Sequence, residues 1–111
     1  MTSKKDVGII VITMFLDWDE NKNKENLQKH GFDFTDAGEL FENPLLVDPD
    51  SRKDYGEDRW IGIGRMANGI IAVIVFTEKE SETIRLISMR KASKKERKKY
   101  EENIQNRLGK N

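Results

Sequence analysis

The sequence contains no cysteine, a single histidine and no long apolar segment, and each shortage excludes a class of protein. Without cysteine the chain cannot build a disulfide scaffold, a thiolate zinc site or a cysteine nucleophile. One histidine excludes a histidine-rich metal site. No apolar run approaches the roughly 20 residues that a membrane helix needs. Hydrophobic residues make up 36% of the 111, against roughly 45–50% in an average globular protein, so we expect one domain with a modest core.

Charge is abundant but unevenly distributed. The 20 basic and 20 acidic side chains cancel, yet residues 1–64 carry eight basic and fourteen acidic ones, whereas residues 65–111 carry twelve and six. From Arg85 to Tyr100, eight basic residues accompany a single acid, Glu96. Such a basic pole suits a polyanion or an acidic protein partner. A solvated helix in a charge-rich protein explains the composition equally well.

The first residues combine two lysines with an apolar run over residues 7–16, as a secretion signal does. No small-residue cleavage site follows, so we expect no export and a cytoplasmic protein. We interpret residues 1–14 as an N-terminal extension or an extra strand, and residues 15–111 as one domain.

Helix signals occur first between Asp19 and Gly31, which suit the two ends of a polar helix over residues 20–30. Leu27 is its main apolar residue, so we expect it to pack through a narrow stripe. A short second helix is expected over residues 35–41.

Strand signals follow, and the predicted strands are residues 45–47, 59–66, 70–77 and 83–89. Asn68-Gly69 is the strongest short hairpin signal and joins the second and third of these. Residues 70–77 are apolar without alternation, which predicts a central strand covered on both faces.

The last helix opens at a capping box formed by Ser93 and Glu96 and runs to about residue 108, with Tyr100 and Ile104 on its apolar stripe. Consecutive hairpins predict an α+β fold with two N-terminal helices, an antiparallel sheet of about four strands and a C-terminal helix.

Arginines lie at the ends of the predicted strands. Arg65 ends one strand, and Arg85 and Arg90 flank the last, with Ser88 between them. Converging on one face of a twisted sheet, three guanidiniums would bind phosphate and stabilise a phosphoryl transition state. The alternative is ordinary ion pairing with nearby acids, namely Glu57, Asp58 or Glu82.

Two residues are candidates for proton transfer. His30 has the only side chain whose unperturbed pKa lies near neutrality, but it could equally cap a helix and pack on Trp18. Glu57 precedes a strand in a glycine-marked loop. Tyr100 could stack on a base, although such an aromatic is more often part of the core. The acidic loop over residues 48–54 lacks calcium-loop spacing, and no nucleotide-binding glycine motif occurs, so we expect no metal and no cofactor.

Taken together in order and spacing, the motifs resemble the BrnT family of toxins from bacterial type II toxin–antitoxin pairs. The resemblance spans about residues 15–100. The matching residues are Trp18-Asp19, Lys22, Asn26, Lys29-His30-Gly31, Phe34, Asn43-Pro44, Gly56-Glu57, Arg59, Gly64-Arg65, Phe76-Thr-Glu78, residues 84–93, Glu96-Arg97 and Tyr100.

The resemblance implies a RelE-like fold and a small ribonuclease that cleaves RNA and blocks translation. Its implied partner is a BrnA-like ribbon-helix-helix antitoxin, and DNA would be contacted only through that antitoxin. We expect no membrane partner. The alternative is a non-catalytic RelE-like module that binds an antitoxin or nucleic acid without cutting.

A metal-independent ribonuclease would use the RNA 2′-hydroxyl as nucleophile and leave a 2′,3′-cyclic phosphate. Arginines would hold the phosphate, and Lys29, His30 or Glu57 would move protons. The predicted catalytic residues are His30, Glu57, Arg65 and Arg85, and the predicted RNA-binding residues are Lys29, Ser88, Arg90, Lys91 and Tyr100.

Overall fold

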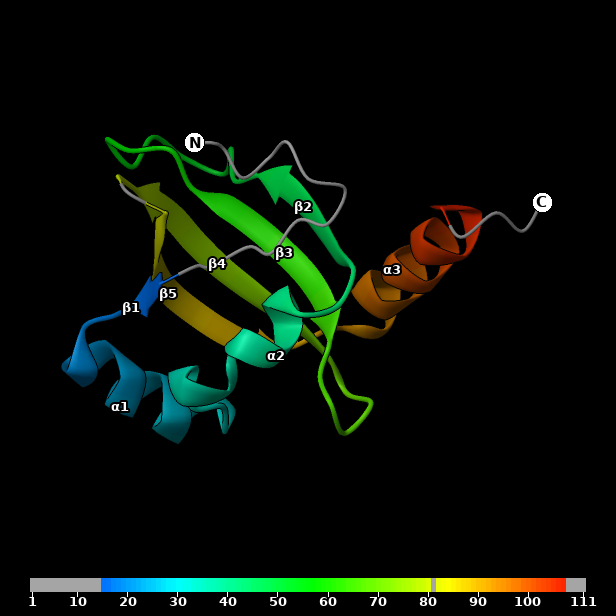
Figure 1. The fold of residues 1–111 in the computed structure, drawn as a ribbon, viewed down its shortest axis with the longest axis horizontal. Coiled ribbons are helices and arrows are strands. Elements are labelled where there is room, and N and C mark those ends of the chain that lie inside the picture. The colour runs from blue at the N-terminus through cyan, green and yellow to red at the C-terminus, as the bar shows by residue number, and fades with distance from the viewer. Residues whose placement is uncertain (1–14, 81, 108–111) are drawn as a thin grey trace, which may run out of the picture.

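The computed structural model describes residues 15–80 and 82–107 (Figure 1). Its elements in chain order are β1 (Phe15–Asp17), α1 (Glu20–His30), the 3-10 turn η2 (Phe34–Asp36), α2 (Gly38–Phe41), β2 (Leu45–Pro49), β3 (Trp60–Arg65), β4 (Ile71–Lys79), β5 (Thr83–Lys91) and α3 (Lys94–Arg107). The strands form one sheet in the order β1-β5-β4-β3-β2. Within the described residues, no helix has the length and apolar character needed to cross a membrane.

The helix predicted over residues 20–30 is confirmed as α1. The Asp19 carboxylate accepts a hydrogen bond from the Asn21 backbone N–H at 2.8 Å, and Gly31 ends the helix in the left-handed conformation at φ 79°. The prediction that Leu27 packs this helix is wrong, because the residue is 46% exposed.

Two buried asparagines attach α1 to the rest of the fold. Asn26 Nδ2 donates to the Met89 carbonyl at 2.8 Å and to the Phe32 carbonyl at 3.1 Å, while its Oδ1 accepts from the Met89 N–H at 3.0 Å. Asn23 Oδ1 accepts from the Phe34 N–H at 2.8 Å. The Asn26 amide therefore satisfies backbone groups of β5 that a neighbouring strand would otherwise satisfy, and a polar helix can pack here without an apolar stripe.

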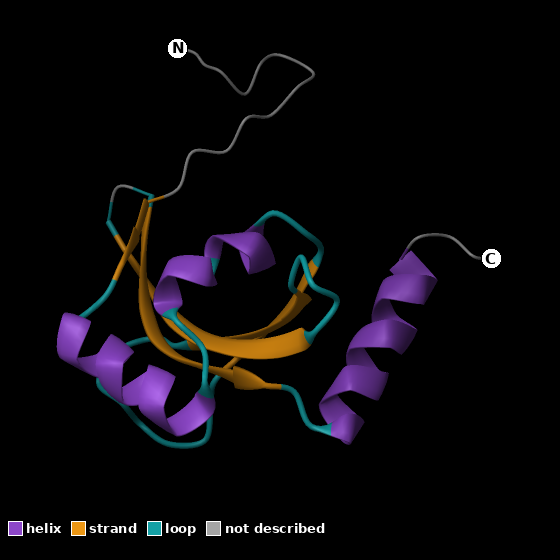
Figure 2. Ribbon diagram, turned by 90° about the horizontal axis from the view of Figure 1, so that it is seen from below, coloured by secondary structure: helices purple, strands orange, loops and turns teal. Residues whose placement is uncertain are grey.

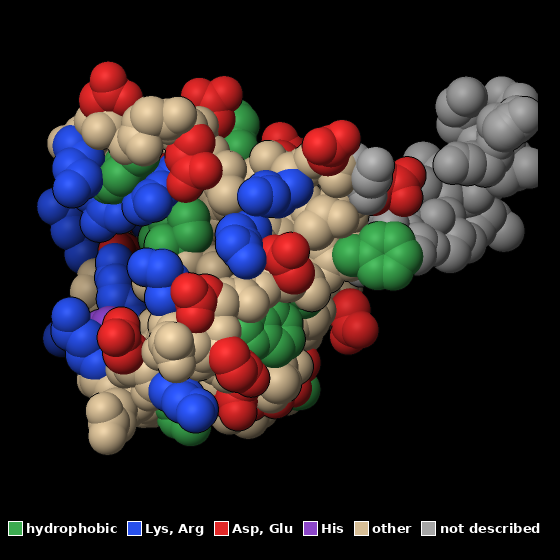
Figure 3. Space-filling model, turned by 90° about the vertical axis from the view of Figure 1, so that its left-hand side faces the viewer, with side chains coloured by type: hydrophobic (Ala, Val, Ile, Leu, Met, Phe, Trp, Pro, Cys, Tyr) green, Lys and Arg blue, Asp and Glu red, His purple; other side chains and the backbone are tan. Residues whose placement is uncertain are grey.

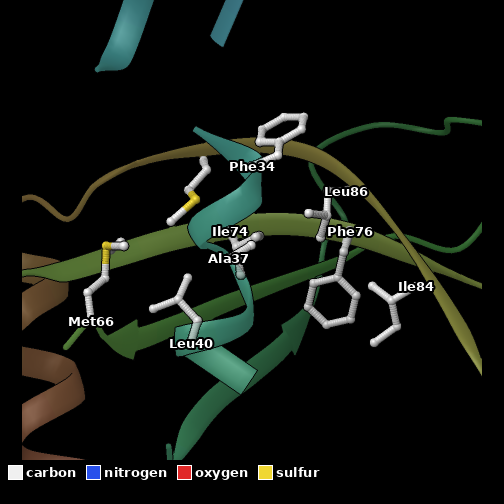
Figure 4. Close-up of a cluster of buried hydrophobic side chains, with 10 residues drawn as sticks. Phe34, Ala37, Leu40, Met66, Ile74, Phe76, Ile84 and Leu86 are labelled. Atoms are coloured by element: carbon white, nitrogen blue, oxygen red, sulfur yellow. The ribbon is translucent and has the colours of Figure 1, made fainter. Parts of the chain in front are cut away.

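The sheet carries a separate core on each face. Figure 2 shows η2 and α2 within the curve of the sheet and α3 away from them, while α1 lies along the edge formed by β5 (Figure 1). Beneath η2 and α2 the buried cluster consists of Phe34, Ala37, Leu40, Met66, Ala72, Ile74, Phe76, Ile84, Leu86 and Met89 (Figure 4). On the α3 side, the second buried cluster consists of Ile63, Ile71, Val73, Ala92 and Tyr100. Because β4 contributes to both clusters, the predicted central strand covered on both faces is confirmed.

The hairpin and the last helix also follow the predicted pattern. The turn between β3 and β4 places Gly69 at φ 92°, where glycine avoids steric strain. The predicted capping box is present: the Ser93 N–H donates to Glu96 Oε1 at 2.8 Å, and the Glu96 N–H donates to Ser93 Oγ at 3.1 Å. The predicted extension or strand over residues 1–14 lies outside the described residues.

The prediction of about four strands, all antiparallel, is wrong in detail. The sheet has five strands, and β1 runs parallel to β5 with Asp17 opposite Arg85. Segments almost 70 residues apart in sequence pair here without a hairpin between them. No local turn signal marks such a pair, so the sequence pattern could not show it.

The predicted second helix over residues 35–41 is broken into two short pieces. The Asp33 carboxylate accepts from the Thr35 N–H at 3.0 Å and starts η2, after which α2 makes a single turn from Gly38. Its Leu40 is fully buried, so packing rather than helix propensity holds this segment.

Candidate functional site

Arginines predicted to form the site project from one face of the sheet. Arg85 lies between Ile84 and Leu86, which belong to the core under η2 and α2, so its side chain points to the opposite face. Arg90 follows Met89 of the same core and points the same way. We call this side of the sheet, against which α3 packs, the α3 face; it carries Arg65, Arg85, Ser88 and Arg90 from the strands and Tyr100 from α3.

The arginines share this face but do not meet. Arg65 lies opposite Ile71 of β4, and Arg85 lies opposite Thr77, six residues further along. At roughly 3.3 Å per residue these two positions are about 20 Å apart, and Arg90 lies nearer the Arg65 end. The predicted convergence of all three on one phosphate is therefore wrong, whereas their common face is as predicted.

Arg90 is held in place by the start of α3. Its Nη1 and Nη2 lie 2.8 Å from Glu96 Oε1 and Oε2 respectively, a bidentate pair. These hydrogen bonds raise the pKa of Arg90 and lower the pKa of Glu96 to about 2. The same carboxylate accepts from the Ser93 N–H, so the capping box also fixes the guanidinium.

Arg85 is held more loosely. Its Nε lies 3.3 Å from Asp17 Oδ1, and both side chains are about half exposed. An exposed pair of this kind contributes little to stability, so Arg85 can exchange Asp17 for another anion. Within the described residues, the ion-pair partners of Arg85 and Arg90 are Asp17 and Glu96, not the acids named as alternatives from the sequence.

Arg65 is exposed and, within the described residues, makes no ion pair. It lines a hollow of about 640 Å³ between α3 and the turn that follows α2; the other lining residues are Asn43, Pro44, Tyr100, Glu101, Ile104 and Gln105. The Tyr100 hydroxyl donates to the Pro44 carbonyl at 2.9 Å, and the ring is buried. Burial raises the pKa of Tyr100, and the positive charge of Arg65 opposes that rise.

His30 and Lys29 end α1, which lies along the edge of the sheet formed by β5 (Figure 1). Asn26 lies one helical turn before His30 and bonds to Met89, so the end of α1 lies beside the last residues of β5, among them Lys91. Lys29 and Lys91 are exposed and His30 is half-buried.

Glu57 lies at the other end of the sheet. Its Oε2 is 3.2 Å from Arg59 Nε, and the neighbouring Asp58 carbonyl accepts from Thr77 Oγ1 at 2.6 Å. Because Thr77 is opposite Arg85, Glu57 belongs to the Arg85 end. The two candidates for proton transfer, His30 and Glu57, are therefore at opposite ends.

Sequence reasoning missed the cations of the loop between β2 and β3. Arg52 makes two hydrogen bonds of 2.8 Å to the buried Asp50 carboxylate, which lower the pKa of Asp50 to about 2. Asp48 Oδ2, near the start of this loop, lies 3.4 Å from Lys99 Nζ of α3, which places the loop beside the α3 face. The positive charge of Arg52 accordingly lowers the pKa of Arg90, against the larger rise caused by Glu96.

The same loop carries an aromatic ring between basic residues. The Tyr55 ring centroid lies 4.1 Å from the Arg59 guanidinium carbon and 5.4 Å from Lys53 Nζ. The alternation of basic and aromatic residues is visible in the sequence, but there the turn-forming residues around it dominate the pattern. Figure 3 shows basic side chains gathered along one side of the molecule, with acidic ones spread over the rest of that view.

The chain is a small α+β protein whose mixed sheet presents spaced cations on one face, an arrangement that suits a polyanion. Within residues 15–80 and 82–107, no three acidic or histidine side chains are placed to hold a metal ion.

Comparison with known proteins identifies the family. The family model of the ribonuclease toxin BrnT of type II toxin–antitoxin systems matches residues 18–96. A crystal structure of the Brucella abortus ribonuclease toxin BrnT is similar, with 33% sequence identity and a TM-score of 0.57 over 74% of this chain and 100% of that one. No curated protein matches the chain. The chain belongs to the BrnT family of ribonuclease toxins, as its motifs suggested.

Proposed function

We propose that this protein is a metal-independent endoribonuclease that cleaves RNA on the α3 face and is neutralised by a BrnA-like ribbon-helix-helix antitoxin. One observation carries the proposal: in a member of a ribonuclease toxin family, β5 aligns Arg85, Ser88 and Arg90 along one face of the sheet. An enzyme that blocks translation acts where ribosomes are, so the proposal includes a cytoplasmic location.

The two arginines of β5 bind different phosphates. Arg85 and Arg90 lie opposite Thr77 and Val73, four residues apart, which is about 13 Å along β4. Ser88 lies between them and adds a hydroxyl donor. A single RNA strand running along β5 would therefore meet a cation near each end and a neutral donor in the middle.

The scissile phosphate is assigned to Arg90. Its guanidinium is already oriented by Glu96, so little reorganisation is needed when charge develops in the transition state. Lys29 and Lys91 add positive potential at this end of the sheet. Arg65 remains available to bind a further part of the RNA strand. Tyr100 positions α3, because its hydroxyl donates a hydrogen bond to the Pro44 carbonyl.

The reaction needs a nucleophile and a proton carrier. The RNA 2′-hydroxyl attacks the adjacent phosphorus and loses its proton to the base. The bond from phosphorus to the 5′ oxygen breaks, and that oxygen takes up a proton. His30 is assigned both transfers because imidazole accepts and donates protons near neutral pH and this residue lies at the Arg90 end. Glu57 is the alternative, which would move the scissile bond to Arg85.

Cleavage under chelation tests the proposal. Purified protein with EDTA should cut RNA to fragments that end in 2′,3′-cyclic phosphate and begin with a 5′-hydroxyl. His30→Ala should abolish cleavage, and Glu57→Gln should leave most of it. Fragments that appear only with an added divalent cation would contradict metal independence. RNA binding without fragments, both with EDTA and with an added divalent cation, would favour the non-catalytic module. The ion pairs of Arg85 and Arg90 with Asp17 and Glu96 are compatible with such a module.

The proposed antitoxin is tested separately. A short neighbouring reading frame with a ribbon-helix-helix pattern should encode a protein that co-purifies with this chain and stops cleavage in proportion to its concentration. A neighbouring product that binds but leaves cleavage intact would contradict the proposed neutralisation.

A further inference from the structure

The hollow beside Arg65 is a rigid site with polar and apolar walls. Pro44 and Tyr100 are joined by the 2.9 Å hydrogen bond of the tyrosine hydroxyl. Asn43 Nδ2 donates to the Glu39 carbonyl at 3.0 Å and to the Arg65 carbonyl at 3.3 Å, which ties the end of α2 to the end of β3. The walls are therefore held by bonds that do not involve the Arg65 guanidinium.

Two opposite charges line this hollow without neutralising each other. Arg65 and Glu101 are both exposed, and in the described part of the chain neither makes an ion pair. A phosphate bound by Arg65 would also meet the negative charge of Glu101. A neutral group with acceptors on one edge and donors on another would satisfy both side chains, while Pro44 and Ile104 offer it an apolar surface.

We propose that this hollow binds a guanine base of the RNA substrate, an inference that rests on the proposed ribonuclease function. Guanine presents O6 and N7 as paired acceptors, which a guanidinium such as Arg65 recognises bidentately. Its N1–H and N2 amino group are donors that the Glu101 carboxylate accepts. Adenine places an amino donor beside N7, and the pyrimidines lack N7, so each loses contacts that guanine makes. Bases unstacked from single-stranded RNA are recognised along these edges.

The hollow lies at the right place for a nucleotide next to the cut. Arg65 is on β3 and Arg90 is on β5, two strands away, which is roughly 10 Å across the sheet. A base in the hollow and a phosphate at Arg90 would therefore belong to neighbouring positions of one RNA strand. Such a base would determine which RNA sequences are cut.

Equilibrium binding of RNA that cannot be cut tests the inference without relying on cleavage. The probe is an oligouridine in which every ribose carries 2′-fluorine in place of the hydroxyl, with one central guanosine, inosine or adenosine. The protein should bind the guanosine probe about tenfold more tightly than the adenosine probe, with inosine between them because it lacks the N2 amino group. Glu101→Gln should reduce the preference for guanosine over adenosine to about twofold.

Lys98→Ala is the matched control, because Lys98 is exposed on the side of α3 away from Tyr100. It should keep the full guanosine preference, and melting curves should show that both variants are folded. Equal binding of the probes by the unaltered protein, or an unchanged preference in Glu101→Gln, would overturn the inference. If the guanosine preference is present but no RNA is ever cut, the proposed function fails and the base site stands. If RNA is cut without any base preference in binding, the base site fails and the proposed function stands.

Discussion

At the scale of single residues, polar side chains take the place of the apolar ones that usually form a helix interface. Asn26 is buried and makes three hydrogen bonds, two of them to the backbone of Met89 on β5. These bonds connect residues 63 positions apart in sequence. They hold the end of α1, with His30, beside the end of β5.

Replacing Asn26 should therefore destabilise the fold more than its size suggests. Asn26→Leu leaves the Met89 N–H and carbonyl buried without partners, and we expect a loss of about 2–4 kcal/mol in the free energy of unfolding. Urea denaturation measures this loss. Asn21→Ala, an exposed asparagine of the same helix, should change the free energy by less than about 1 kcal/mol. Equal stability of the two variants would contradict the role of Asn26.

Two glycines should respond to alanine with opposite signs. A Cβ at Gly64 would lie 2.9 Å from Leu45 Cδ1 and 3.3 Å from Leu40 Cδ2, so Gly64→Ala should cost about 1–3 kcal/mol through overpacking. A Cβ at Gly38 meets no atom within 4 Å, and alanine is the better helix former, so Gly38→Ala should stabilise by up to about 1 kcal/mol. Thermal melting would show both shifts, and a stabilising Gly64→Ala would be the contrary result.

At the scale of elements, local chemistry made most of the secondary structure predictable. The caps of α1, the Asn68-Gly69 turn and the capping box at Ser93 each satisfy backbone groups within a few residues, so each leaves a mark in the sequence. The parallel pairing of β1 with β5 has no local sequence signal, because it joins segments far apart in the chain and depends on the tertiary fold. The break between η2 and α2 was missed for a different reason: Leu40 is held by tertiary packing.

The junction of β5 with α3 should make stability sensitive to acid. Glu96 has its pKa lowered from 4.5 to about 2, chiefly by its hydrogen bond from Arg90. A carboxylate with a depressed pKa stabilises the fold above its unfolded value, and that stabilisation disappears as the pH falls through its folded value. The free energy of unfolding should therefore decline between about pH 4.5 and pH 2.

Chemical denaturation at several pH values checks this decline. Glu96→Gln should be less stable at pH 7, and its stability should fall less steeply with acid. Glu102→Gln, on the exposed surface of the same helix, should retain the full fall. An acid profile for Glu96→Gln parallel to that of the unaltered protein would show that the pair with Arg90 does not contribute.

At the scale of the whole molecule, the candidate site was predictable in composition but not in arrangement. Arg85 and Arg90 are five residues apart, so strict strand alternation would place them on opposite faces. A bulge in β5 between Leu86 and Ser88 brings both to the face that also carries Arg65, and no residue spacing predicts it. Their separation along β4 follows from register, which long-range pairing decides. Arg52 was missed because its loop only reaches the α3 face once β2 and β3 have paired. The assignments of His30 and Glu57 to proton transfer stay predictions.

A spread of cations should make RNA binding depend on salt. Each phosphate contact lowers the logarithm of the affinity by about 0.7 per logarithm of salt concentration for a single strand. Two or three arginine contacts on the α3 face thus predict a slope of about −1.4 to −2.1. With the 2′-fluoro probe, Arg90→Ala should flatten the slope by about 0.7, whereas Lys98→Ala should not change it. A slope near zero would exclude phosphate contacts as the source of affinity.

The rate of RNA cleavage in the presence of EDTA, compared between Arg90→Ala and Lys98→Ala, tests the central claim most directly. Each substitution removes one positive charge, but only Arg90 lies on the α3 face. Loss of a preorganised group that stabilises transition-state charge typically costs about 100-fold or more, so Arg90→Ala should cut RNA at least about 100-fold more slowly while Lys98→Ala matches the unaltered protein. Equal rates for the two variants, with both folded, would contradict cleavage on the α3 face.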